Sequence, residues 1–193
     1  MEEIQSIAID MDQVIVDTLQ KEIDTYNRLF NRNLVKDDLS GKTIHEFMSK
    51  EEWIELYNEV NKKGFFRDLE FIDSDTRWVI EEMNKIYDIY ICTAAMEVPE
   101  SFEDKFLWLR EHLPFLDKNK FIFCGFKYVV GTDVLIDDSP YQLRRVRGQS
   151  IIYTSPFNEK MDLPYKRVDN WKEIGDIFLV KEADKDVLGH SAD

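Results

Sequence analysis

Two aspartates near the N-terminus, Asp10 and Asp12, are the residues from which a chemical interpretation of this chain begins. They lie at the end of a short apolar run, residues 4–10, that predicts a buried strand. Residues i and i+2 of an extended chain point to the same side, so both carboxylates should project together. Two like charges at close range repel each other. A cation, a shared proton or a role in handling phosphate would offset that cost.

Three later positions carry polar side chains at or just beyond the ends of further predicted strands. They are Thr93, Lys127 and the acidic pair Asp137-Asp138. Open α/β sheets bind their ligands at the carboxyl ends of the strands. We therefore expect these side chains to meet Asp10 and Asp12 at one edge of a shared sheet. The strands are expected at 88–93, 121–124 and 134–138.

Phosphoryl transfer is the chemistry that suits this set of side chains. An ionised aspartate can attack phosphorus and form an acyl phosphate, which splits hydrolysis into two easier steps. A second carboxyl group can protonate the leaving alkoxide and then deprotonate the attacking water. Mg²⁺ prefers carboxylate, carbonyl and water oxygens and offsets crowded negative charge. A threonine hydroxyl and a lysine ammonium supply donors to the phosphoryl oxygens.

The elements that must position these residues follow an α/β order. From residue 73 the periodicity predicts helix, strand, helix, strand, strand, helix, strand and helix, which is typical of a mostly parallel sheet. The helices are expected at 74–85, 99–114, 141–147 and 171–180, and the last strand at 150–154. The predicted fold class is therefore α/β.

Nearly 60 residues without a strand signal separate the first strand from the helix near residue 74. Connections between a strand and a helix usually take 2–6 residues, so residues 18–72 are expected to be an all-helical insertion. Placed directly after the paired acids, such a cap would cover the active end of the sheet and could act as a lid. The predicted α/β core is then 1–17 and 73–180, with a fraying tail at 181–193.

Composition narrows the classes of partner. The chain has 193 residues and a formal net charge of −14, so it lacks the basic surface that nucleic acid polymers and anionic membranes require. A small anionic substrate needs only one positive pocket. The N-terminus shows no signal peptide, and Cys92 and Cys124 lack metal-site spacing, so we expect reduced core thiols in a cytoplasmic protein.

The order of the motifs resembles the haloacid dehalogenase-like superfamily of Mg²⁺-dependent phosphohydrolases. Its motifs are Asp-x-Asp, then Ser or Thr, then Lys, then an acidic pair, on a Rossmann-like parallel sheet with a cap. The resemblance implies that Asp10 is the nucleophile and Asp12 the general acid and base. The insertion resembles a C1-type cap. The implied phosphate-binding residues are Thr93, Ala94 and Lys127, and Mg²⁺ would be held by Asp10, the backbone carbonyl of Asp12, and Asp137, with Asp138 supporting the metal site.

A closer resemblance, to the 5'(3')-deoxyribonucleotidases, rests on residues 64–70, 91–93 and 133–138 and on the spacing from Lys127 to Asp137. It implies hydrolysis of deoxynucleoside monophosphates. Cap aromatics in that family wall the base and sugar pocket, which would assign Phe65 and Phe66 to substrate binding. Arg67 would contact substrate or form a surface ion pair. Two positions depart from the family pattern: Gln13 replaces a usual glycine, and Ala94 lacks a hydroxyl.

Other functions remain open on the sequence. A phosphatase for a sugar phosphate or another small metabolite would use the same catalytic set. A receiver-like phosphoacceptor module also combines acids, Thr, Lys and Mg²⁺, but receivers lack a helical insertion after the first strand. A non-catalytic metal-binding protein would bind Mg²⁺ without hydrolysis. The sequence does not indicate an oligomeric state.

Overall fold

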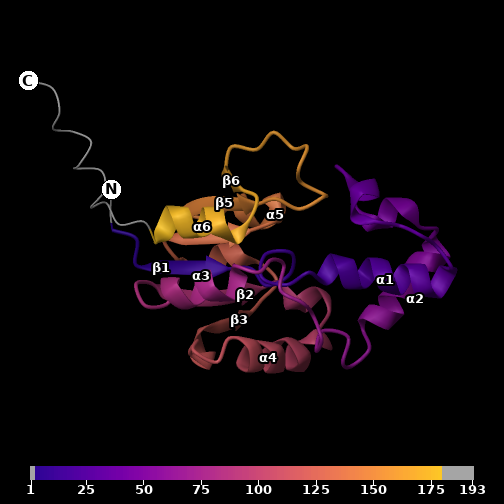
Figure 1. The fold of residues 1–193 in the computed structure, drawn as a ribbon, viewed down its shortest axis with the longest axis horizontal. Coiled ribbons are helices and arrows are strands. Elements are labelled where there is room, and N and C mark those ends of the chain that lie inside the picture. Colours follow the sequence, from indigo (N-terminus) through magenta and orange to yellow (C-terminus); the bar gives the residue numbers. More distant parts are fainter. Residues whose placement is uncertain (1–2, 180–193) are drawn as a thin grey trace, which may run out of the picture.

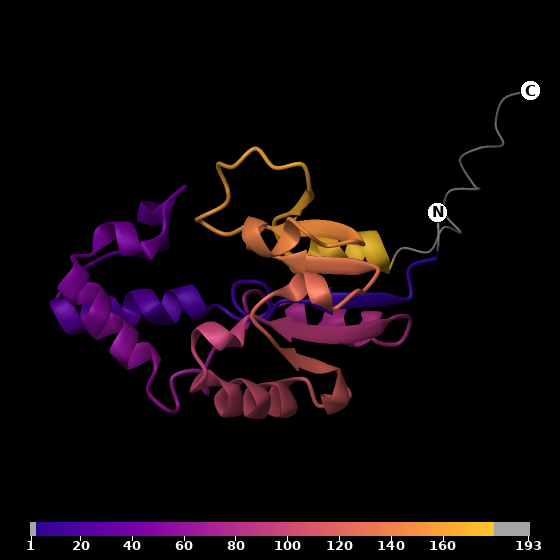
Figure 2. The ribbon, with the colours of Figure 1, turned by 180° about the vertical axis from the view of Figure 1, so that it is seen from behind.

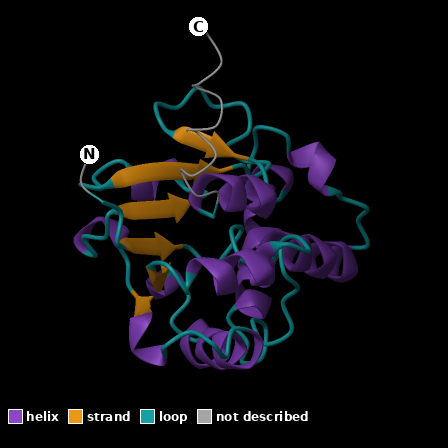
Figure 3. Cartoon of the chain, turned by 60° about the vertical axis from the view of Figure 1, so that its left-hand side comes forward, coloured by secondary structure: helices purple, strands orange, loops and turns teal. Residues whose placement is uncertain are grey.

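The fold is built on a six-stranded sheet in which every neighbouring pair of strands is parallel. In this computed structural model, which describes residues 3–179, the strand order is β3-β2-β1-β4-β5-β6 (Figure 1). Drawn by secondary structure, the strands point in one direction (Figure 3). The strands are β1 (Ser6–Ile9), β2 (Asp88–Thr93), β3 (Phe121–Phe123), β4 (Val134–Asp137), β5 (Gln149–Tyr153) and β6 (Lys166–Val168).

Alternate residues of the central strands pack into two separate cores. On β1, Ile7 and Ile9 join the larger core, whereas Ala8 faces the smaller one with Cys92 and Leu135. This alternation follows from the two-residue period of a strand. Because both faces are buried, the strands consist of nearly continuous apolar runs, as is usual for parallel sheets. The α/β prediction is confirmed.

The helices largely match the predicted pattern but are shorter. They are α1 (Thr18–Phe30), α2 (Lys50–Val60), α3 (Thr76–Met83), α4 (Ser101–His112), α5 (Pro140–Leu143) and α6 (Trp171–Phe178). Strand β6 was not expected, because two of its three residues are charged and it therefore shows no apolar run. Within residues 3–179, no helix has the length and apolar character needed to cross a membrane. The predicted tail lies outside the described residues.

Helices α1 and α2 lie beyond the carboxyl end of β1, away from the sheet (Figure 2). The chain leaves the sheet and returns to it as two adjacent segments. The backbone N–H of Asp17 donates to the carbonyl of Glu70 at 3.0 Å, and that of Ile72 donates to the carbonyl of Ile15 at 2.9 Å. These two hydrogen bonds hold the start and the end of the segment 18–71 next to each other, beside the sheet. The division into core and cap domains stays a prediction.

Two fully buried tryptophans donate hydrogen bonds to the segment that leaves the sheet and to the segment that returns to it. The indole N–H of Trp171 donates to the carbonyl of Val14 at 2.7 Å, and that of Trp108 donates to the carbonyl of Leu69 at 2.9 Å. Each bond satisfies a backbone group that would otherwise be buried without a partner. Helices α6 and α4 are thereby attached to the outgoing and the returning segment, respectively.

Replacing Trp171 with phenylalanine is expected to lower the free energy of unfolding by roughly 1–3 kcal/mol, because the carbonyl of Val14 loses its buried donor. Urea denaturation measures this change. Trp78 is the matched control, since its side chain is 57% exposed and it lies on the surface of α3. Trp78→Phe should change stability by less than about 0.5 kcal/mol. Equal losses in the two variants would contradict the assigned role of Trp171.

Candidate active site

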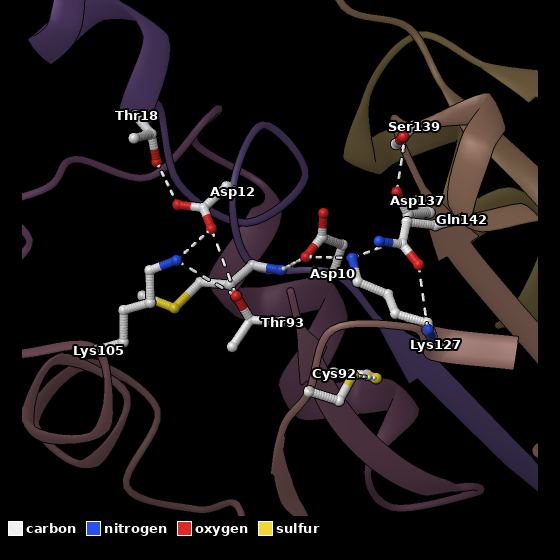
Figure 4. A network of polar contacts seen from close by, with 12 residues as sticks. Asp10, Asp12, Thr18, Cys92, Thr93, Lys105, Lys127, Asp137, Ser139 and Gln142 are labelled. Carbon is white, nitrogen blue, oxygen red and sulfur yellow. Dashed lines mark hydrogen bonds and ion pairs between the residues drawn. The ribbon is translucent and has the colours of Figure 1, made fainter. Parts of the chain in front are cut away.

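Asp10, Lys127 and Asp137 form a buried ion cluster at the carboxyl ends of β1 and β4 (Figure 4). The ammonium of Lys127 lies 2.6 Å from Oδ1 of Asp10 and 2.6 Å from Oδ2 of Asp137. Burial lowers the pKa of Lys127, but the charges of the two aspartates outweigh burial and raise it. Lys127 therefore stays an ammonium. It acts as a fixed positive charge between the ends of two strands.

The carboxylate of Asp10 is held in one orientation. Its Oδ1 accepts hydrogen bonds from the backbone N–H of Met11 at 2.7 Å as well as from Lys127. Burial raises the pKa of Asp10 well above its usual range; Lys127 opposes that rise, and Asp137 adds to it. The ionised carboxylate is thus costly in the protein without a further cation. No described residue donates a hydrogen bond to Oδ2, so Oδ2 is the oxygen that can react.

A group of three carboxylates fits a divalent cation. Carboxylate oxygens of Asp10, Asp137 and Asp138 lie within 4.8 Å of one another. Burial, together with the charge of Asp137, raises the pKa of Asp138 to about 7. Lys127 supplies one positive charge against three acids, so negative charge remains in excess. Hard oxygen donors with excess negative charge are the ligands that Mg²⁺ prefers.

Asp12 points away from this cluster and is held by donors from two helices. Its Oδ1 accepts from the hydroxyl of Thr18 at 2.6 Å, and its Oδ2 accepts from the ammonium of Lys105 at 2.5 Å. Burial alone would raise the pKa of Asp12, but the charge of Lys105 and these hydrogen bonds lower it. The hydroxyl of Thr93 completes the group, 3.4 Å from Oδ2 of Asp12. The two aspartates of the motif therefore occupy chemically different surroundings.

Gln13 explains how the turn after Asp12 forms without glycine. Its φ is 59°, in the left-handed region that glycine usually occupies. With the amide oxygen facing α1, the side chain accepts from the backbone N–H groups of Thr18 at 3.0 Å and Leu19 at 2.5 Å. The first N–H groups of a helix have no partner within the helix. Gln13 thus caps α1 and offsets the strain of its own backbone.

A cavity of about 350 Å³ opens between the sheet end and residues 18–72. Asp10, Asp12 and Lys127 lie on its sheet side. The opposite wall comes from the insertion and combines apolar and polar side chains. That wall consists of Thr18, Leu19, Glu22, Leu39, Lys42, Thr43, Ile44, His45, Val60 and Phe66. The volume lies within the range of small-molecule sites.

The structure brings most of the predicted site residues to this cavity, and Ala94 and Phe66 line it. Thr93 is 1% exposed, and its hydroxyl faces Asp12 and Lys105 rather than open space. Phe65 and Arg67 are not among the lining residues; the guanidinium of Arg67 pairs with Glu111 at 2.9 Å. The surface ion pair, one of the two alternatives for Arg67, is therefore the one seen.

Three polar residues around Asp12 were not predicted from the sequence: Thr18, Glu22 and Lys105. Lys105 is 4% exposed although it carries a charge. One signal was available, because Lys105 lies three and four residues before Trp108 and Leu109, which places it on the buried face of α4. Thr18 and Glu22 are four residues apart and share one face of α1. Only the fold shows that this face looks toward Asp12.

Replacing Glu22 with glutamine should make stability less dependent on pH. Burial, together with the charge of Asp12, raises the pKa of Glu22 from 4.5 to about 7. Between these values the folded protein binds a proton that the unfolded chain releases, so Glu22 lowers stability as pH rises through this window. Glutamine removes that loss. We expect thermal unfolding to show a gain on the order of 2 kcal/mol at pH 8 and little at pH 4; equal differences at both values would contradict this.

Solved structures with the same fold define the class. A haloacid dehalogenase-like family hydrolase from Streptococcus pneumoniae superposes with a TM-score of 0.63 at 17% identity, covering 92% of this chain and all of that chain. A Bacillus subtilis protein described as a "putative HAD-hydrolase" bound to magnesium gives a TM-score of 0.55 at 15% identity, covering 93% of this chain and 100% of that chain. The fold is thus that of the haloacid dehalogenase-like hydrolases.

The family follows from the sequence comparisons. Residues 3–184 match the model of the 5' nucleotidase, deoxy (pyrimidine), cytosolic type C protein family. A protein of Staphylococcus epidermidis named "Putative 5'(3')-deoxyribonucleotidase" is 39% identical over 174 residues, which is 90% of this chain and 96% of that protein. The 5'(3')-deoxyribonucleotidase of Bacillus subtilis is 32% identical over 168 residues, covering 87% and 95%. This chain belongs to the 5'(3')-deoxyribonucleotidase family of phosphomonoester hydrolases.

Proposed function

We propose that this protein hydrolyses deoxynucleoside monophosphates to nucleoside and phosphate, with Asp10 as nucleophile and Mg²⁺ as cofactor. The observation that carries the proposal is the separation of the two aspartates: Asp10 belongs to a cation cluster, whereas Asp12 is held by Thr18 and Lys105 on the cavity side. Family membership supplies the substrate class. The same separation suits a two-step transfer through an aspartyl phosphate.

In the first step, Oδ2 of Asp10 attacks phosphorus and the bond to the nucleoside oxygen breaks. Lys127 and the backbone N–H of Met11 fix the other oxygen of Asp10, so the attacking atom is positioned before substrate arrives. Asp10, the backbone carbonyl of Asp12, and Asp137 would hold Mg²⁺, with Asp138 in support. When bound, the cation neutralises charge on the phosphoryl oxygens and on the nucleophile.

Asp12 handles the proton in both steps. Its lowered pKa leaves it ionised in the protein without substrate. A phosphate group placed beside it adds like charge, which raises the pKa of a carboxyl group and allows it to carry a proton to the leaving alkoxide. The resulting carboxylate then takes a proton from the water that hydrolyses the acyl phosphate. Thr18 and Lys105 orient the carboxyl group throughout.

Residues 18–72 are proposed to act as a C1-type cap that selects the nucleoside. They contribute the cavity wall opposite Asp10, including Phe66 and Glu22. An aromatic wall offers a face on which a base can stack, and Glu22 offers an acceptor or, once protonated, a donor. Thr93, Ala94 and Lys127 remain the proposed phosphate-binding residues. We propose a cytoplasmic location and no nucleic acid polymer as substrate, in line with the family description and the net charge of −14.

Phe66→Ala should lower kcat/KM for a deoxynucleotide by about 5–150-fold, because base stacking contributes roughly 1–3 kcal/mol. The matched control is Phe65→Ala. Phe65 is 8% exposed and Phe66 is 4% exposed, but only Phe66 lines the cavity. Steady-state kinetics on a deoxynucleotide and on deoxyribose 5-phosphate separate the base contact from general damage. If Phe65→Ala and Phe66→Ala change the ratio of kcat/KM between these two substrates equally, Phe66 does not contact the base.

A substrate panel tests the proposed function directly. Initial rates are measured with Mg²⁺ on deoxynucleoside 5'- and 3'-monophosphates, ribonucleotides and sugar phosphates, and again with the metal chelated. We expect the highest kcat/KM on a deoxynucleotide and loss of activity without the metal. A clear preference for a sugar phosphate over every nucleotide would overturn the substrate assignment. Mg²⁺ binding without turnover of any phosphomonoester would overturn the enzymatic one.

A further inference from the structure

The two cysteines of the chain lie in contact directly beneath the proposed phosphate site. Cys92 (Figure 4) belongs to β2 and Cys124 follows β3. Their sulfur atoms are 3.6 Å apart. The parallel register pairs Cys92 with Ile122, so Cys124, two residues farther along, points to the same face of the sheet. The backbone N–H of Cys124 donates to the carbonyl of Thr93 at 3.0 Å, which keeps the two segments together.

We propose that Cys92 and Cys124 are a redox modification site, in which a peroxide converts the two thiols to a disulfide and thereby lowers phosphatase activity. The inhibitory part rests on the proposed function, whereas formation of the disulfide does not. A disulfide requires the sulfur atoms to approach from 3.6 Å to about 2.05 Å. The sulfur atoms must therefore move about 1.5 Å closer, and because Cys124 lies two residues beyond the register partner of Cys92, part of that movement comes from the backbone.

The two thiols differ in a way that assigns the order of events. Cys124 is partly exposed and Cys92 is fully buried. A hydrogen bond from Cys92 lowers the pKa of Cys124 to about 7; burial opposes this effect and the charge of Lys127 adds to it. The same hydrogen bond, with burial, raises the pKa of Cys92. Cys124 is therefore the thiolate that meets an oxidant first, because the thiolate is the nucleophilic form.

The chemistry balances with one molecule of hydrogen peroxide. The thiolate of Cys124 attacks one peroxide oxygen, the O–O bond breaks, and with a proton from solvent the products are a sulfenic acid and water. The sulfur of Cys92 then attacks the sulfenic sulfur, the S–O bond breaks, and the thiol proton leaves with the oxygen as a second water. Two thiols lose two electrons and two protons, and peroxide is reduced to two molecules of water.

The disulfide would act on the site through the residues that follow each cysteine. Thr93 is next to Cys92, and its hydroxyl contacts Asp12 and Lys105. Beyond Cys124, the carbonyl of Gly125 accepts from the side chain of Gln142, which in turn accepts from the backbone N–H of Lys127 at 3.1 Å. A shift at the sulfur atoms therefore reaches groups around both aspartates. Displacements near 1 Å in such groups can cost about a hundredfold in rate.

The test treats the intact protein with hydrogen peroxide, alkylates remaining thiols after denaturation, and maps the products by mass spectrometry. We expect a loss of two hydrogens, a peptide joining Cys92 to Cys124, no covalent dimer, and at least a tenfold fall in phosphatase activity. Dithiothreitol should restore both thiols and the activity. Cys92→Ser should stop the reaction at a sulfenic acid on Cys124 that dimedone captures, and the variant with serine at both positions should keep its activity through the same treatment.

Each contrary result bears on a separate part of the proposal. Two alkylated thiols after treatment, or a disulfide between two chains, would overturn the modification site. The internal disulfide with unchanged activity would overturn the inhibition and leave the site. Equal peroxide sensitivity of the double serine variant would assign the loss of activity to other residues. Peptide mapping needs no turnover, so failure of the proposed nucleotidase function is distinguishable from failure of the redox site.

Discussion

Asp10→Asn is expected to lower kcat on every phosphomonoester by at least about a thousandfold, because the amide cannot form the acyl phosphate. The fold should survive the change. The new side-chain amide would keep an oxygen to accept from Met11 and Lys127, and Lys127 would retain Asp137 as its ionic partner. The raised pKa of Asp10 means that its ionised form lowers stability at neutral pH, so removing the charge should not unfold the protein.

Steady-state kinetics and thermal unfolding of the same preparation separate chemistry from folding in this variant. Asp88→Asn provides the matched control, since Asp88 is an exposed aspartate at the opposite end of the same sheet. Its activity should match that of the parent protein. Near-full activity of Asp10→Asn would show that a different group attacks phosphorus and that the role assigned to Asp10 is wrong.

Asp12→Asn should lower turnover of a deoxynucleotide by about a hundredfold to ten-thousandfold, the usual contribution of a general acid and base. The variant should be slowed only in those steps of the reaction in which Asp12 transfers a proton. A substrate whose leaving group needs no proton should still phosphorylate Asp10, so the protein should release one equivalent of leaving group and then stall. A burst of one equivalent, followed by slow turnover, is the expected time course in a stopped-flow experiment.

The ion pair of Asp12 requires a second variant. Lys105 is 4% exposed, and Asp12→Asn leaves its ammonium without a carboxylate partner, which can cost several kcal/mol of stability. Asp12→Asn combined with Lys105→Met removes that unpaired charge. If Asp12→Asn and the double variant both lose turnover, while the double variant regains stability, the loss of turnover comes from the missing carboxyl group and not from unfolding. A double variant that turns over like the parent protein would contradict the role of Asp12.

The site could be predicted where strand order alone brings residues together. Asp10, Lys127 and Asp137 meet because each lies at or beyond the carboxyl end of a strand, and parallel strands end at one edge. Apolar runs in the sequence predicted five of the six strands of the sheet. Strand β6 was not predicted, because its sequence, Lys166–Val168, is too short and too polar to show a period. Local pattern thus identifies strands with apolar runs, including the short edge strand β3, and misses a short strand that is mostly charged.

The contacts that hold Asp12 could not be predicted, for a different reason. Lys105 and Thr18 lie on helices far from each other in sequence, and only the three-dimensional fold brings both side chains to the carboxylate of Asp12. Gln13 was noted as a departure from the family pattern, but its role as a helix cap depends on how α1 begins. Phe65 and Phe66 are adjacent in the chain, yet only Phe66 lines the cavity. Such assignments require tertiary structure.

The central claim is that phosphate passes from a deoxynucleotide to Asp10. The most direct test mixes the Mg²⁺-loaded protein, and its Asp12→Asn variant, with a deoxynucleoside monophosphate carrying ³²P, quenches in acid within milliseconds, and maps the label. We predict protein-bound phosphate on the peptide containing Asp10, accumulating to higher levels in the variant and absent from Asp10→Asn. Release of phosphate at the steady-state rate with no label on the protein at any time would contradict the account.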